Sequence, residues 1–326
     1  MNAVDIKGLT KRYNKKPAVD GISLAIEKGE IFGLLGPNGA GKTTTIKMLS
    51  TILKITSGKA KVSGFDVQEH PDEVRRSIGI VFQDPAIDIE LTGRENLDFH
   101  ARLYGMKGHE RGKRIKEVLG IVEMEDGADM LVAKYSGGMK RRLEIARGLM
   151  HYPKVLFLDE PTLGLDAQTR RVIWDHIMKI NKEEGVTIIL TTHYMDEADY
   201  LCSRVAIIDQ GRILKSGSPS KLKGSIGEDV VYVKSKDNKA FKKALAKKKW
   251  VSKICNGYLS INLEHGEKKI PEIIRISESI GVSVDSIELK KPTLEDVFIK
   301  YTGRKIRAEE ASSTDMMRLQ ARMHGR

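Results

Sequence analysis

The chain has 326 residues, of which 40% are hydrophobic and 31% charged, with a formal net charge of +12; these values are typical of a globular protein with one large or two ordinary domains. No apolar run approaches the roughly 18 residues of a membrane-spanning helix, and the N-terminus lacks the features of a signal peptide, so we expect a cytoplasmic protein. Cys202 and Cys255 suit a reducing compartment and lack metal-ligand spacing, so we expect both to fill the core.

The first 30 residues alternate apolar and polar side chains, for example over residues 4–7 and 22–26. This pattern predicts antiparallel strands. The short apolar run over residues 31–35 follows and predicts a buried strand.

A glycine-rich segment follows that strand directly and fits the phosphate-loop pattern G-x-x-x-x-G-K-[ST]. Its residues are Gly36, Pro37, Asn38, Gly39, Ala40, Gly41, Lys42 and Thr43. A strand, a glycine loop and a helix over residues 44–49 would aim backbone N–H groups at an anion. Lys42 would reach the β- and γ-phosphates, and the Thr43 hydroxyl would hold Mg²⁺. A chance match in a glycine-rich turn is the alternative, but the strand and helix on either side favour a nucleoside triphosphate site.

Residues 92–135 predict a mainly helical insertion. Thr92 and Gly105 look like the cap and the stop of a helix, although the apolar spacing between them is ambiguous. Residues 114–122 predict a second helix.

Ser136, Gly137 and Gly138 precede a predicted helix over residues 139–150. A serine cap and two glycines at a helix start form a second candidate anion site. Two anion sites are more than a simple kinase needs for one nucleotide.

An apolar run over residues 155–158 predicts a strand that ends in Asp159 and Glu160. A carboxylate beside a phosphate loop is where Mg²⁺ needs a second protein anchor, and we assign Asp159 to that role. Glu160 would point toward the γ-phosphate side and polarise a water as general base. The alternative is an acidic turn before Pro161.

The chain then alternates between strand and helix, which predicts a mostly parallel sheet covered on both faces. A helix is expected over residues 168–181 and a strand over residues 187–190. A hairpin over residues 205–214 closes the sheet. On the buried face of the helix we expect Val172, Ile173, Ile177 and Ile180.

Beyond Gly227 the order becomes β-α-β-β-α-β, which predicts a small ferredoxin-like domain, with Asn256 and Gly257 as a hairpin turn. A terminal helix is expected over residues 292–301, and the polar tail from Arg304 is predicted to be disordered. Residues 221–326 hold 23 Lys and Arg against 14 Asp and Glu. An anionic partner such as lipid or nucleic acid is one interpretation of this charge, but we favour a solvated lysine-rich surface.

Six motifs in this order resemble the ATP-binding subunit of an ABC transporter over about residues 1–225. They are residues 36–43, Gln83 after an apolar strand, residues 135–139, residues 158–161, residues 164–166 and His193. The resemblance implies an α/β fold: a P-loop NTPase core with an antiparallel β subdomain and a helical subdomain over about residues 85–152. We therefore predict three parts: the ATP-binding cassette (1–225), an α+β accessory domain (228–302) and a disordered tail (303–326).

The resemblance also implies a role for each matching residue. The phosphate loop, with Lys42 and Thr44, would bind the ATP phosphates, and Glu160 would be the catalytic base. The other implied roles are Mg²⁺ ligation by Thr43, Gln83 and Asp159, a γ-phosphate contact by His193 and adenine stacking by Tyr13. Alone, Gln83 is more often a surface amide, Tyr13 a strand-end aromatic and His193 a core residue. Tyr135 departs from the family, which usually has leucine there.

Residues 136–138 would close over the ATP of a second subunit, with Asp166 at the dimer interface. Residues 91–97, 163–166 and 292–298 resemble ATPases of the daunorubicin-resistance type of multidrug exporter. That resemblance implies a dimer on the cytoplasmic face of the cell membrane, for which we expect a homodimer, with a pair formed with a second ATPase as the alternative. The dimer would power export of a drug-like or lipophilic substrate through a separate permease, without a nucleic-acid partner. An importer ATPase, or a soluble ATPase that acts on ribosomes or DNA, are the alternatives.

Overall fold

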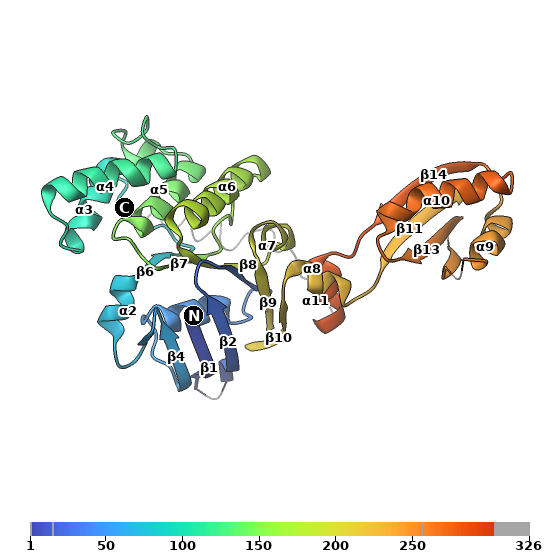
Figure 1. The fold of residues 1–326 in the computed structure, drawn as a ribbon. Coiled ribbons are helices and arrows are strands. Elements are labelled where there is room, and N and C mark those ends of the chain that lie inside the picture. The colour runs from blue at the N-terminus through green and yellow to red at the C-terminus, as the bar shows by residue number, and fades with distance from the viewer. Residues whose placement is uncertain (1, 15, 249, 256, 303–326) are drawn as a thin grey trace, which may run out of the picture.

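The computed structural model describes residues 2–302 except residues 15, 249 and 256. These residues form three sheets with helices around them (Figure 1). The tail from Arg304 and the Asn256 half of the predicted turn lie outside the described residues. Within residues 2–302, apart from the three gaps, no helix is long and apolar enough to cross a bilayer.

A six-stranded sheet forms the centre of the molecule, in the order β10-β9-β3-β8-β7-β6. Its strands are β3 (Ile31–Leu35), β6 (Ile78–Val81), β7 (Val155–Asp159), β8 (Thr187–Thr192), β9 (Arg204–Asp209) and β10 (Arg212–Gly217). All neighbours are parallel except β10, which forms an antiparallel hairpin with β9. The predicted parallel sheet with a closing hairpin is therefore confirmed.

An antiparallel sheet covers one face of the central sheet, with helices α1 (Lys42–Leu49) and α2 (Pro71–Ser77) beside it. Its strands are β1 (Asn2–Tyr13), β2 (Lys16–Glu27), β4 (Ser57–Val62) and β5 (Phe65–Asp66), in the order β2-β1-β4-β5. Phe32 and Leu34 of β3 enter the core on this side, whereas Ile31 and Leu35 enter the core on the other side. The phosphate loop therefore leaves a strand that is fixed on both faces.

Helices cover the other face of the central sheet (Figure 1). They are α3 (Gly93–Leu103), α4 (Gly108–Ile121), α5 (Gly137–Leu149), α6 (Ala167–Glu184), α7 (Met195–Leu201) and α8 (Pro219–Gly224), with a short 3₁₀ turn over Val132–Lys134. The ambiguous first helix of the insertion is real. Thr92 caps it by accepting from the Glu95 N–H, and the Glu95 side chain bonds back to Thr92.

Two local predictions differ from the structure. Helix α4 begins at Gly108 rather than at residue 114, because its Arg111 pairs with Asp98 of α3 and holds the first turn despite two weak helix formers, Gly108 and Gly112. On α6 the expected Val172 is 39% exposed, whereas Ile173, Ile177 and Ile180 are buried. Val172 is one residue, or about 100° of helix rotation, away from Ile173 and so leaves the buried stripe. Cys202 is buried as expected, and the Cys255 side chain lies outside the described residues.

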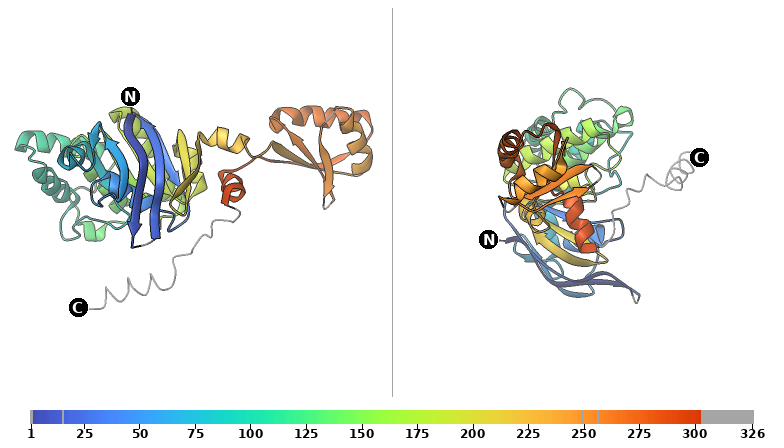
Figure 2. Two further views of the ribbon diagram at one scale, coloured as in Figure 1. Left: turned by 90° about the horizontal axis from the view of Figure 1, so that it is seen from below. Right: turned by 90° about the vertical axis from the view of Figure 1, so that its right-hand side faces the viewer.

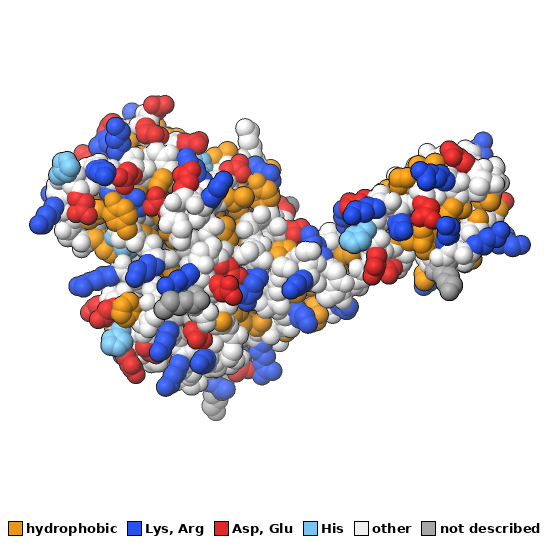
Figure 3. Space-filling view, in the orientation of Figure 1, with side chains coloured by type: hydrophobic (Ala, Val, Ile, Leu, Met, Phe, Trp, Pro, Cys, Tyr) orange, Lys and Arg blue, Asp and Glu red, His pale blue; other side chains and the backbone are white. Residues whose placement is uncertain are grey.

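The third sheet has the order β12-β13-β11-β14, all antiparallel. The elements of this unit are β11 (Asp229–Ser235), α9 (Asn238–Ala246), β12 (Ser252–Cys255), β13 (Tyr258–Leu263), α10 (Gly266–Ser279) and β14 (Val284–Lys290). It has its own core, which includes Val231, Phe241 and Ile273. The predicted ferredoxin-like pattern is therefore confirmed. Figure 2 shows this unit extending away from the rest of the chain, and Figure 3 shows Lys and Arg side chains over its surface.

The last described helix, α11 (Leu294–Thr302), does not pack on the third sheet. Its Leu294, Val297 and Phe298 are buried in the helical core of the first part of the chain, together with Leu222 of α8. The chain thus leaves the first part after α8 and returns to it with α11. The exact domain boundaries stay a prediction.

Candidate functional site

The phosphate loop joins β3 to α1, and two of its glycines are required by the backbone. A Cβ added to Gly36 would lie 2.2 Å from the carbonyl oxygen of Ile208. Gly41 has a φ of +104°, and a Cβ there would lie 2.5 Å from the Ala18 oxygen. Any side chain at either position would force the loop away from the sheet.

The loop borders a cavity of about 430 Å³. Strand β2 and the segments that follow β3, β6 and β7 meet in it, with the lining residues Ala18, Pro37, Asn38, Gly39, Gly41, Lys42, Thr43, Thr44, Gln83, Glu160 and Leu163. Gln83 follows β6 and Glu160 follows β7, so the parallel sheet brings the carboxyl ends of both strands to the loop. Clefts at this edge of a parallel sheet are the usual ligand sites of such folds.

Lys42 is held directly over the loop. Its Nζ donates to the carbonyl oxygens of Gly36 (2.7 Å) and Pro37 (3.2 Å) and lies 2.9 Å from Glu160 Oε1. Both charged side chains are almost fully buried. Glu160 is therefore the counter-charge of the Lys42 ammonium, which borders the cavity; its phosphate role stays a prediction.

Asp159 and Thr43 form the candidate metal site. The Thr43 and Thr191 hydroxyls both donate to Asp159 Oδ1, at 3.0 and 2.6 Å. Among the described residues no group of three or more His, Cys, Asp or Glu side chains could hold a metal ion. A magnesium ion typically takes one or two carboxylates together with phosphate and water oxygens, and the oxygen atoms of Thr43, Asp159 and Gln83 fit that requirement.

Glu160 has a backbone conformation that is uncommon for glutamate, with a φ of 49°. Its N–H donates to Thr191 Oγ1 (3.0 Å) and to the Thr191 carbonyl (3.2 Å). Residues in this region usually carry strain that the surrounding structure must hold. The strained backbone directs the Glu160 carboxylate between Lys42 and His193, whose Nδ1 lies 2.9 Å from Oε2.

Opposing influences act on the Glu160 carboxyl group. Burial is the largest single influence and works to raise its pKa, but the hydrogen bond from His193 and the charge of Lys42 together hold the pKa below its ordinary value. The carboxylate is therefore ionised at neutral pH and able to accept a proton.

The second candidate anion site lies apart from this cavity. Ser136 caps α5 as predicted, because its Oγ accepts from the Met139 N–H at 3.2 Å. Gly138 packs against Thr169 at the start of α6, which Asp166 caps. Neither residues 136–138 nor Asp166 line the phosphate-loop cavity, and Ser136 and Gly137 are exposed. Their assignment to a site shared with another subunit stays a prediction.

Tyr13 does not line the cavity either. It is 52% exposed near the end of β1, with Lys11 Nζ 5.4 Å from the ring centroid. An exposed ring is free to stack on a base, but the adenine role stays a prediction. Tyr135 is buried and donates to the Gly127 carbonyl at 2.7 Å, so the aromatic residue at this position fills core space.

Three residues around the site were not singled out from the sequence. Thr191 contacts both Asp159 and Glu160 and stands at the end of β8, so the expected neighbouring strand offered a signal for it. Glu197 is fully buried and accepts from Thr162 (2.7 Å) and Trp174 (2.9 Å), and burial raises its pKa. Arg141 of α5 is buried, and it donates to the backbone carbonyl of Glu160. Nothing local in the sequence marks a buried arginine or glutamate on an amphipathic helix.

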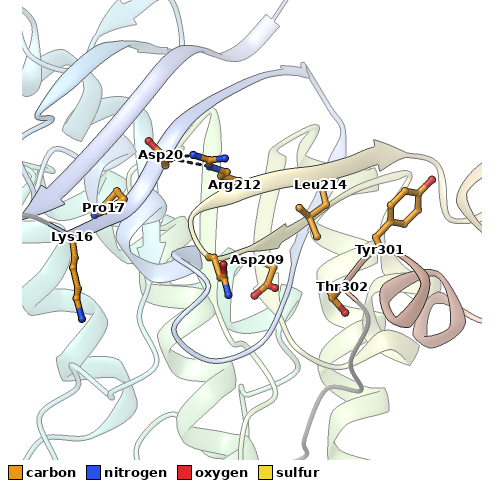
Figure 4. A pocket seen from close by; sticks show the side chains of 9 residues that line it. Lys16, Pro17, Asp20, Asp209, Arg212, Leu214, Tyr301 and Thr302 are labelled. Carbon is orange, nitrogen blue, oxygen red and sulfur yellow. Dashed lines mark hydrogen bonds and ion pairs between the residues drawn. The ribbon is translucent and has the colours of Figure 1, made fainter.

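A larger hollow of about 720 Å³ lies between β2, the β9–β10 hairpin and α11 (Figure 4). Arg212 pairs there with Asp20 at 2.7 Å. None of the predicted site residues lines it, so the phosphate-loop cavity remains the candidate site.

The chain is similar to two protein families and to several characterised proteins. The ABC transporter family model matches residues 19–163, and the model of the "ATP-binding protein DrrA1-3-like, C-terminal domain" matches residues 217–302. The daunorubicin resistance ATP-binding protein DrrA2 of Streptomyces coeruleorubidus is 39% identical over 318 residues, 95% of this chain and 98% of that protein. The Nod factor export ATP-binding protein I of Burkholderia thailandensis is 39% identical over 305 residues, 93% and 98% of the two chains.

A solved structure is similar to the first part of the chain. It is the dimeric post-hydrolysis state of the ATP-binding cassette MJ0796 bound to ADP and Pi, with a TM-score of 0.60 and 30% identity. The match covers 66% of this chain and 98% of that one.

Proposed function

The chain belongs to the ATP-binding proteins of ABC transporters, and we propose how its residues carry out ATP hydrolysis and connect it to export. It is an ATP-hydrolysing subunit of the drug-resistance exporter type. The observation that carries the residue assignment is the buried Glu160 carboxylate between Lys42 and His193, beside the phosphate loop.

In this proposal the loop amides and Lys42 bind the phosphates of ATP. Lys42 exchanges Glu160 for phosphate oxygens, and the released carboxylate accepts a proton from the attacking water. His193 keeps that carboxylate aimed through its 2.9 Å contact and reaches toward the γ-phosphate. Thr43, Gln83 and Asp159 hold Mg²⁺, which when bound offsets negative charge on the phosphates.

The second anion site serves the ATP of another subunit. Ser136 and Gly137 are exposed and lie outside the chain's own cavity, as they must if they contact a nucleotide held elsewhere. The similar cassette that was solved with ADP and Pi is a dimer. We propose a homodimer with two shared ATP sites and with Asp166 at the interface.

A membrane-spanning partner fits an apolar surface beside α3. Phe99 and Leu103 of α3 are 59% and 68% exposed. Both border a cavity of about 180 Å³ that is also lined by Ala86 and Leu91. Exposed apolar side chains gathered in one place mark protein contact sites. The segment that contains Ala86 comes directly after Gln83, so a permease docked here would be mechanically coupled to the nucleotide site. The subunit would then lie at the cytoplasmic face of the membrane.

The transported substrate is not fixed by similarity. The daunorubicin resistance protein DrrA2 and the Nod factor export protein of Burkholderia thailandensis are both 39% identical to this chain. Export of a drug-like or lipophilic substrate is therefore our proposal, with selection among such substrates in the membrane partner.

The test is Mg²⁺-dependent ATP hydrolysis by the purified protein, with Lys42→Ala as the inactive control. We expect hydrolysis by the wild type only, and an ATP-dependent shift of Glu160→Gln to a dimer in size-exclusion chromatography. Equal hydrolysis by Lys42→Ala would contradict the assigned site. The candidate permease is a protein with about six hydrophobic spans encoded by the neighbouring reading frame. Co-purification with this chain tests whether the two proteins associate.

A further inference from the structure

Arg141 has a buried guanidinium that donates to four backbone carbonyl oxygens beside the candidate site. It lies in the first turns of α5 and is 7% exposed. Its N–H groups donate to the carbonyl oxygens of Pro161 (2.7 Å), Asp159 (3.0 Å), Glu160 (3.1 Å) and Phe82 (2.6 Å). One side chain thus holds the backbone after β7 and the backbone directly before Gln83.

Glu144 completes this arrangement one turn further along α5. It is 1% exposed, and its Oε2 accepts from Arg141 at 3.1 Å. Its Oε1 accepts from the Ala86 N–H at 2.9 Å. Together Arg141 and Glu144 contact the chain on both sides of Gln83, and Glu144 provides the counter-charge that a buried arginine requires.

The carbonyl contacts explain how Glu160 keeps its strained backbone. Its N–H is bound to Thr191 and its carbonyl oxygen to Arg141. A residue with a φ of 49° persists only where its surroundings hold it. Arg141 also stands three residues, or about 4.5 Å of helix rise, after Gly138. A displacement of the helix start would therefore move the support of Glu160.

We propose that Arg141, oriented by Glu144, is a positioning residue that links the two ATP sites of the dimer. The Ser136–Gly138 end of α5 contacts the ATP of the partner. When that end of the helix moves, Arg141 moves with it and shifts the backbone of Glu160 and the backbone next to Gln83 in its own subunit. Glu160 is then aligned for proton transfer only when α5 is seated on the other nucleotide. This inference rests on the proposed function, that is, on ATP hydrolysis at two shared sites.

The decisive variant is Arg141→Lys. Lysine keeps the positive charge beside Glu144 but lacks the planar group of five N–H donors that reaches several carbonyls at once. We expect nucleotide affinity, measured with a fluorescent ATP analogue, to stay within about twofold while kcat falls at least roughly tenfold, as small misplacements of catalytic groups do. The Hill coefficient for ATP should fall toward unity.

Arg142→Lys is the matched control. Arg142 is the next residue of the same helix, and its guanidinium donates to the carbonyls of Val122 and Glu123 rather than to the site. Its kcat and Hill coefficient should stay at wild-type values. Glu144→Gln, which keeps the side-chain shape and removes the counter-charge, should change kcat in the same direction as Arg141→Lys.

Two results would overturn the inference. One is an Arg141→Lys protein that keeps more than half of the wild-type kcat and an unchanged Hill coefficient. The other is loss of nucleotide binding or of the cooperative unfolding transition in that variant, because Arg141 would then support the fold and not position Glu160. If the wild type itself does not hydrolyse ATP, the proposed function fails, which is a separate outcome.

Discussion

Replacing Glu160 by glutamine perturbs the centre of the site with little change of shape. The carboxylate is the ionic partner of Lys42 at 2.9 Å and accepts from His193 at 2.9 Å. Glutamine removes the charge, although its amide oxygen can still accept a hydrogen bond from Lys42, which also keeps its carbonyl partners, Gly36 and Pro37. The variant therefore leaves a buried ammonium without a counter-charge.

The size of the effect follows from these contacts. Breaking a buried ion pair typically costs about 3–5 kcal/mol, but the remaining carbonyls and the open cavity reduce this figure, and we expect a free energy of unfolding lower by about 2 kcal/mol. For a domain of this size the melting temperature should fall by roughly 4–8 °C. Loss of a general base should lower kcat by about 10²- to 10⁴-fold. ATP supplies new counter-charges to Lys42, so it should raise the melting temperature of Glu160→Gln more than that of the wild type.

Thermal unfolding with and without ATP, in EDTA to prevent hydrolysis, measures the stability effects, and an ATPase assay measures kcat. Asp20→Asn is the control, because it breaks a more exposed ion pair, with Arg212, and should cost at most about 1 kcal/mol. A nucleotide-free Glu160→Gln protein as stable as the wild type would refute the stabilising role of the ion pair. Hydrolysis at the wild-type rate would refute the assignment of Glu160 as base.

Three further predictions concern pH, packing and docking. The pKa of Glu160 is lowered in the folded chain, so its ionised carboxylate stabilises the fold above the unfolded pKa of about 4.3. This stabilisation is lost as the pH falls through the lowered pKa of the folded state. The melting temperature of Glu160→Gln should therefore depend less on pH than that of the wild type in this acidic window. Phe298→Ala should cost about 3–5 kcal/mol, because the ring is fully buried in the core of the first part, and limited proteolysis should then cleave near α11. Phe99→Ser and Leu103→Ser should change the unfolding free energy by no more than about 0.5 kcal/mol, since both side chains are exposed, but should abolish co-purification with the permease. Retention of the permease would show that it docks elsewhere.

The sequence by itself determined the local parts of this protein. The strand, glycine loop and helix around Lys42 follow from backbone constraints that a short segment contains, and so do the capping of α3 by Thr92 and of α5 by Ser136. The order β-α-β-β-α-β was likewise enough to predict the ferredoxin-like unit, because hydrophobic periodicity and turn residues act over a few positions.

Only the tertiary structure decided which distant residues meet. Thr43 and Asp159 are 116 positions apart and share a hydrogen bond because β3, β8 and β7 are neighbours, an order that no local pattern specifies. The burial of Arg141 behind Glu160 and the return of α11 to the first core were not predicted for the same reason. Periodicity marks the apolar face of a helix, but the partners of a buried charge depend on how strands and helices are arranged around it.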